Sequence, residues 1–310
     1  MTSLHNQVLP RTETGDALTR FVFEHTAVSG SCATLGPASR ALIACHPYPP
    51  AVARAIAEMA ACAALLSSAL KFDGRLVLQL SGDGPLRLMV VESGRQLALR
   101  ATAQWSEERI AGLSAGASIE QLAGGPGHGR FVIVLDRDNA PTYQGIVALQ
   151  PGSVADLIAH YLEVSEQIDS RIALAYADGA VAAMLLQRMP SAGDEDLALW
   201  QRIGQDAGDG ANARAVAALL AGTPVDKVLQ MRFPADDIRL FATATPRFEC
   251  SCSKERVARA LLIAGPDEVE AAIAERGQIE VSCEFCNRHH LFTPGEARAL
   301  FALRPVPARH

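Results

Sequence analysis

Cys250-Ser251-Cys252 and Cys283-Glu284-Phe285-Cys286 lie in the stretch Phe248 to Phe292, around which the rest of this chain can be understood. These two motifs hold four of the seven cysteines, and residues 253–282 separate them. Four thiols in two close pairs are typical of a tetrahedral zinc site or of two disulfides. Because so small a unit buries little apolar surface, a metal is its expected source of stability. Zinc would supply roughly 10–16 kcal/mol at neutral pH.

The segment between the two motifs has room for regular structure. Ser253 is placed to cap a helix that continues to Ala264, with apolar residues at helical spacing, and Gly265-Pro266 ends it. A second short helix is predicted over 267–274. Residues 278–281 then have the pattern of a strand that leads directly to Cys283.

The spacing of the cysteines leaves three interpretations open. Cys-x-Cys is tight for zinc and tighter for a disulfide, which would be strained and easily reduced. The pattern favours a structural zinc site first, a redox-switched zinc site second and two disulfides last.

Five polar residues near the four thiols could affect how the thiols bind zinc or react with oxidants. Positive neighbours favour the thiolate, which binds zinc and reacts with peroxide, and the sequence places three of them nearby: Lys254, Arg256 and Arg288. His289 and His290 are alternative ligands, but with four thiols present they are interpreted as surface or packing residues.

The whole pattern resembles the C-terminal zinc domain of the heat-shock protein 33 family, the redox-regulated 33 kDa chaperonins. The resemblance rests on Phe248 to Arg256, on Cys283 to Cys286 and on Leu291-Phe292. It continues upstream, so that it covers about Thr19 to Phe292, in these shorter motifs: Lys71-Phe72-Asp73-Gly74, Gln79-Leu80, Gly82-Asp83-Gly84-Pro85, Tyr143-Gln144-Gly145, Ser165-Glu166-Gln167 and Met184-Leu185-Leu186-Gln187.

The resemblance implies an ATP-independent holdase chaperone and not an enzyme. It implies one zinc ion held by Cys250, Cys252, Cys283 and Cys286 in the reduced, inactive form. Oxidation would form the disulfides Cys250–Cys252 and Cys283–Cys286, release zinc and expose a surface for unfolded client proteins. It also implies a homodimer when oxidised.

Composition narrows the class of protein. The chain has 310 residues, 49% of them hydrophobic, and a net charge of −6. Its 28 basic residues are scattered, which argues against a nucleic-acid partner. No secretory leader is evident, so a reducing cytoplasm is expected. The apolar stretch 51–70 is predicted to be a buried helix and not a membrane span. Cys45 and Cys62 are interpreted as inert buried thiols.

The predicted fold is α+β in four parts. A disordered tail (1–15) precedes an N-terminal α/β domain with antiparallel sheets and packed helices (16–190). A metastable helical linker (191–246) and a small Cys₄ zinc domain (247–310) follow. No catalytic set emerges in the N-terminal part, where the histidines are scattered.

The linker carries contrasting signals. Leu197, Trp200 and Ile203 share one helical face, whereas three glycines are expected to break the helix: Gly204, Gly208 and Gly210. Further helices are predicted over 211–221 and 225–232. Helices this short are marginal in water and need a partner surface. The linker could equally be a helical subdomain with no switching role.

Two other functions stay open from the sequence. A thiol–disulfide oxidoreductase could use Cys283 and Cys286, although such enzymes place Cys-x-x-Cys at the start of a helix. A zinc-ribbon nucleic-acid binder is the other alternative, and the acidic balance disfavours it.

Overall fold

The computed structural model describes residues 14–70, 74–125, 127–138, 140–149, 152–189, 193–208 and 210–302. Lys71, Phe72, Asp73, Pro190 and nearly all of the tail expected over 1–15 lie outside these ranges. The chain forms two compact units, Met1–Glu249 and Cys250–His310, and each is described by itself. The division of the first unit into a body and a linker stays a prediction.

Two sheets form the frame of the first unit. The first sheet has the order β10-β1-β2-β9-β8, all antiparallel, with bounds Ile238–Leu240, Ala17–Phe23, Val28–Leu35, Ala180–Arg188 and Asp169–Ala177. The second sheet has the order β11-β5-β4-β3-β6-β7, with bounds Arg247–Phe248, Ala98–Trp105, Leu86–Ser93, Gly74–Gly82, Gly129–Arg137 and Tyr143–Ala148. Its pairings are antiparallel except for the short parallel pair β11–β5. The predicted α+β class with antiparallel sheets is confirmed.

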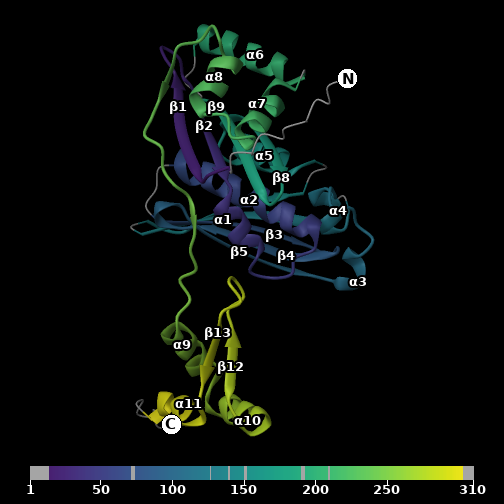
Figure 1. Cartoon of the computed structure of the whole chain (residues 1–310), viewed down its shortest axis with the longest axis vertical. Helices are drawn as coiled ribbons and strands as arrows, with labels where there is room; N and C mark the ends of the chain where they lie inside the picture. Colours follow the sequence, from purple (N-terminus) through teal and green to yellow (C-terminus); the bar gives the residue numbers. More distant parts are fainter. Residues whose placement is uncertain are drawn as a thin grey trace, which may run out of the picture. The chain divides into compact units, whose positions relative to one another are not determined.

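Helix α2 (Pro50–Ala69) lies between the two sheets and contacts strands of both (Figure 1). Proline at its first position suits a helix start, and its many alanines let both sheets approach closely. The helix is long and apolar enough to cross a membrane, yet 83% of its apolar window is buried inside the protein. The prediction of a buried core helix is therefore confirmed.

Shorter helices complete the body of the first unit. Helix α5 begins with a capping box in which Ser153 and Asp156 satisfy each other's backbone N–H groups. It packs on β8 and α2. The bounds of these helices are α1 Pro37–Ile43, the 3₁₀ turn η1 Arg95–Leu97, α3 Glu107–Ile110, α4 Ile119–Ala123 and α5 Val154–Ser165.

Three helices, here called the helical layer, cover the other face of the first sheet (Figure 1). They are α6 (Asp194–Gly208), α7 (Ala211–Leu220) and α8 (Val225–Arg232). The layer and the sheet share an apolar cluster of Phe21, Phe23, Val28, Cys32, Ala182, Met184, Leu186, Leu199, Trp200, Ile203, Ala215, Val216, Leu219, Val228, Leu229 and Phe233. The partner surface that these short helices need is therefore the first sheet.

Gly204 does not break α6, contrary to the sequence prediction. The helix runs through it to Gly208, and Gly204 packs closely against a side chain of the first sheet. A Cβ atom on Gly204 would lie 2.4 Å from Nη2 of Arg171, which projects from β8. The same guanidinium stacks over the ring of Trp200, one helical turn earlier, at 4.8 Å. The loss of helix propensity at Gly204 is thus offset by packing.

The second unit is small. It contains α9 (Lys254–Ala264), α10 (Pro266–Arg276), the hairpin β12 (Ile279–Ser282) and β13 (His289–Phe292), and α11 (Pro294–Ala302). The predicted helices and the strand before Cys283 are confirmed within two residues, whereas β13 and α11 were not predicted. Its buried core comprises five described residues: Val269, Ile273, Ile279, Phe292 and Ala297.

We expect Phe233→Ala to destabilise the helical layer by about 3–5 kcal/mol, because the side chain is buried and meets Phe23 edge-on at 4.9 Å. Met231→Ala on the same helix is the control, since that side chain is 64% exposed, and should change stability by less than about 0.5 kcal/mol. Urea unfolding followed by Trp200 fluorescence, with Trp105 replaced by Phe in every variant, measures both. Equal effects would contradict the packing described.

Candidate metal centre

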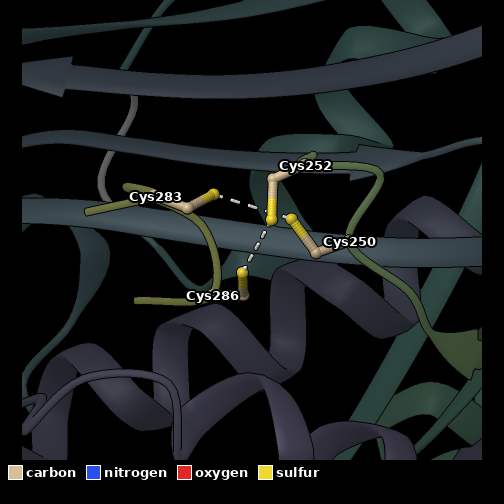
Figure 2. Close-up of side chains that lie close together, drawn as sticks. All are labelled: Cys250, Cys252, Cys283 and Cys286. Carbon is tan, nitrogen blue, oxygen red and sulfur yellow. Dashed lines mark hydrogen bonds between the residues drawn. The ribbon is translucent and has the colours of Figure 1, made fainter. Parts of the chain in front are cut away.

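Four cysteine sulfurs from two separate segments converge in the second unit, as Figure 2 shows. They belong to Cys250, Cys252, Cys283 and Cys286, and all lie within 4.8 Å of one another. The Sγ atoms of Cys250 and Cys283 are 3.7 Å apart, and those of Cys252 and Cys286 are 3.4 Å apart. All four residues are half-buried. The structure therefore brings together the four cysteines that the sequence named as ligands.

The first pair is held where the chain enters α9. The Ser253 side chain caps this helix by accepting a hydrogen bond from the N–H of Arg256 at 3.3 Å. The Arg256 guanidinium in turn donates to the hydroxyl and the carbonyl oxygen of Ser251, at 2.6 and 3.1 Å. These bonds fix the backbone between Cys250 and Cys252, so both thiols face the cluster.

The second pair lies in the loop of the hairpin formed by β12 and β13. The N–H of Cys283 donates to the carbonyl of Arg288 at 2.9 Å, and the N–H of Asn287 donates to the carbonyl of Cys283 at 2.8 Å. Asn287 adopts a φ of 54°, which asparagine tolerates better than most residues. Because Cys283 and Cys286 lie in a hairpin loop and not at a helix start, their setting differs from that of an oxidoreductase.

The cluster fits a tetrahedral metal ion. Sulfurs about 2.3 Å from a central zinc would lie about 3.8 Å from one another, which is close to the separations observed. The same separations are far above the S–S bond length of about 2.05 Å, and all four thiols are free. This arrangement is therefore a reduced four-thiol cluster that could bind a metal ion.

The electrostatics of the cluster differ from one thiol to another. Burial raises the pKa of Cys250, and burial together with the hydrogen bond between Cys252 and Cys286 raises that of Cys252 to about 12. Burial also acts to raise the pKa of Cys283, but hydrogen bonds from the N–H groups of Cys286 and Phe285 outweigh it, so that pKa is lowered. Metal binding must displace the protons of the raised thiols.

The expectation that positive neighbours favour the thiolate is wrong for Cys250 and Cys252, because the pKa values of both thiols are raised. Lys254 instead forms an ion pair with Glu296 at 2.7 Å and lies over the ring of Phe292. Its hydrogen bond and the N–H of Thr293 lower the pKa of Glu296 to about 2. The Thr293-x-x-Glu296 capping box is the sequence signal that could have revealed α11, which was not predicted.

His289 and His290 lie outside the cluster of described metal-ligating groups. His289 is exposed, and its Nδ1 lies 2.5 Å from Oε1 of Glu280 and 3.2 Å from Oγ of Ser282. His290 is buried in β13. Their interpretation as surface and packing residues is confirmed.

The remaining three cysteines belong to the first unit. Burial raises the pKa of Cys32 to about 12 and that of Cys62 still further. Cys45 is half-buried, and its thiol donates to the carbonyl of Ala41 at 3.3 Å. The interpretation of Cys62 as an inert core thiol is consistent with these surroundings, whereas Cys45 is more accessible than predicted.

The chain is similar to known proteins along most of its length. The model of the family described as Hsp33 protein matches residues 16–293. The 33 kDa chaperonin of Methylobacillus flagellatus is 38% identical over 303 residues, covering 94% of this chain and 96% of that protein. That of Chromobacterium violaceum is 36% identical over 295 residues, covering 94% and 96%.

A solved structure has the same fold. The crystal structure of a 33 kDa chaperonin, a heat shock protein 33 homologue, from Thermotoga maritima matches with a TM-score of 0.75. The match covers 93% of this chain and 98% of that one, at 21% sequence identity.

We expect thiol labelling to separate the two groups of cysteines. In reduced protein treated with a chelator, iodoacetamide should label the half-buried cluster thiols in the folded chain, Cys283 faster than Cys252, while Cys32 and Cys62 react only after unfolding in guanidinium. Mass spectrometry of the labelled peptides gives the extent at each site. Labelling of Cys62 as fast as Cys286 in folded protein would contradict the burial described.

Proposed function

Because the chain belongs to the Hsp33 family of chaperones, we propose that it is a redox-regulated, ATP-independent holdase that is inactive while reduced and zinc-bound. The observation that carries the proposal is the convergence of four free thiols in a unit with a very small core. Such a unit depends on its metal, so a reaction of the thiols can change its folding.

The metal that we propose is zinc, one ion per chain, bound by Cys250, Cys252, Cys283 and Cys286. Four thiolates in a closed tetrahedral set are the usual environment of structural zinc. Bound there, zinc would hold the start of α9 against the loop between β12 and β13. The metal supplies folding energy, and no catalytic step is assigned to it.

Oxidation is the proposed trigger. Each pair of thiols would give two electrons and two protons to one molecule of hydrogen peroxide. Each reaction would form one disulfide and two molecules of water. We propose the pairs Cys250–Cys252 and Cys283–Cys286, as the family resemblance implies. All four sulfurs are within 4.8 Å of one another, so the distances select no pairing. Disulfide sulfurs no longer bind zinc as thiolates do, so the ion leaves and the second unit loses its main folding term.

The surface that we propose for clients lies under the helical layer. Its contact with the first sheet is mostly apolar but includes the half-buried Arg171, whose buried Nε has no hydrogen-bond partner among the described residues. Burying such a group costs free energy, which favours a layer that can be released. The layer precedes the second unit in the chain, and we propose that its release accompanies the unfolding of that unit. The sheet face beneath it would then be open to apolar segments of unfolding proteins.

Client proteins are the partners expected of a chaperone family. We further propose that the oxidised protein forms a homodimer and that the protein acts in the cytoplasm, where thiols are normally reduced.

The proposed switch predicts different holdase activity in the two redox states. Reduced, zinc-loaded protein should leave the aggregation of a thermally unfolding client nearly unchanged, whereas peroxide-treated protein should suppress it strongly at the same ratio of chaperone to client. Light scattering measures the aggregation, and re-reduction with added zinc is the control. Equal suppression in both states would remove the switch from the proposal.

Replacing one ligand should abolish stable zinc binding. Cys283→Ser leaves three thiolates and a poor fourth ligand, so we expect zinc content to fall from one ion per chain to well below one. Cys45→Ser is the matched control, because Cys45 is also half-buried but lies outside the cluster, and it should keep one ion. Metal analysis after gel filtration gives the ratio. A full zinc content in Cys283→Ser would contradict the four-thiol site.

A further inference from the structure

One extended segment of the first unit covers an edge of each of its two sheets. Residues 237–249, here called the strap, follow the helical layer and end at the residue before Cys250. Within the strap, β10 pairs antiparallel with β1 of the first sheet, and β11 pairs parallel with β5 of the second. If the strap left, β1 and β5 would each become an edge strand with unpaired N–H and C=O groups.

The strap is held to β1 mainly by backbone hydrogen bonds. The N–H of Phe241 donates to the carbonyl of Arg20 at 2.9 Å. Leu18 and Ala244 exchange two backbone bonds, at 2.8 and 2.9 Å. Residues 239–245 are exposed, so their side chains add little to the core. Because main-chain groups hold the strap, another extended segment could make the same bonds at this edge.

The side chains of β10 show what kind of segment fits this edge. Ile238 lies opposite Phe23 of β1 and packs on the apolar cluster under the helical layer. Leu240 lies opposite Phe21, which belongs to the same cluster. Side chains two residues apart share one face of a strand. A segment with apolar residues at alternate positions would therefore extend the apolar face that the helical layer covers.

The other face of the strap carries a basic and an aromatic side chain. The Nε atom of Arg239 lies 2.6 Å from Oε1 of Glu24, directly after β1. The Arg20 guanidinium lies over the ring of Phe241, 5.2 Å from its centroid. Glu24 and Arg20 would remain at the edge without the strap. The edge therefore matches a basic residue that is followed two positions later by an aromatic residue.

From this edge we infer that β1 takes an extended segment of an unfolding client protein, by antiparallel strand addition, once the strap has left. The inference rests on the proposed release of the helical layer, because the strap follows α8 closely in the chain. The main chain of the client would replace the bonds of the strap to Leu18 and Arg20. The favoured segments alternate apolar residues with a basic and an aromatic residue, as Ile238 to Phe241 do. In the reduced chain the strap excludes such segments from β1.

The test uses a fluorescent peptide that copies residues 236–246, with its binding to the reduced, zinc-loaded full chain measured by fluorescence anisotropy. Combining Phe241→Pro with Ala244→Pro removes two donors of the strap to β1, so this double variant should bind the peptide at least about tenfold more tightly than wild type. Ala242→Pro is the matched control, because Ala242 makes none of the described backbone bonds to β1, and it should bind as weakly as wild type. Circular dichroism and zinc content check that the variants are folded.

Methylation of single backbone nitrogens in the peptide tests strand addition itself. A methyl group on the nitrogen of Phe241 or Ala244 removes a donor to β1, so it should weaken binding to the double variant and to the oxidised wild-type chain at least about tenfold. A methyl group on the nitrogen of Ala242 should have little effect. Equal effects at the three positions would mean that side chains alone hold the peptide, and the proposal would be wrong.

The oxidised wild-type chain separates this inference from the proposed function. It should bind the peptide, and the peptide should compete with an unfolding client. If the oxidised chain protects the client, but neither it nor the double variant binds the peptide, strand addition is wrong and the holdase function stands. If the double variant binds the peptide while the oxidised chain protects no client, the edge takes strands and the redox-regulated function is wrong.

Discussion

The contact among four sulfurs is the interaction on which the second unit of this protein depends. Its apolar core is too small to hold two helices, a hairpin and a further helix on its own. Local bonds, such as the Ser253 cap and the Lys254–Glu296 ion pair, orient the segments but lie at the surface, where they contribute little. The cysteine cluster is the feature that joins the entry to α9 with the distant loop between β12 and β13.

The first unit is built in the opposite way. Helix α2 is buried between two sheets, and its small side chains allow a single large core to form around it. That core needs no metal or disulfide. The protein thus combines a first unit that is stabilised by apolar packing with a second unit that brings four thiols together around a very small core. Under the proposed function, a redox change would act on the second unit and leave the first folded.

The helical layer is held by apolar packing, as the core of the first unit is, but this packing includes a charged side chain. It buries Trp200, Ile203 and Phe233 on the first sheet, but it also covers the Nε of the half-buried Arg171, which finds no hydrogen-bond partner among the described residues. Gly204 lowers the intrinsic helix propensity of α6, and the Arg171 guanidinium lies where a side chain at this position would begin. A layer held in this way is consistent with the release that we propose for it.

The sequence by itself determined the cysteine cluster, the helix that begins after Ser253, the buried character of α2 and the family. These features depend on residue type and short-range spacing, which a single chain displays directly. The tertiary structure decided what depends on contacts between distant segments. Features that depend on such contacts include the continuation of α6 through Gly204, the raised pKa of Cys252 beside Cys286, and the position of β7 at the edge of its sheet. Each of these follows from which groups the fold brings together, and neighbouring residues in the sequence do not specify that.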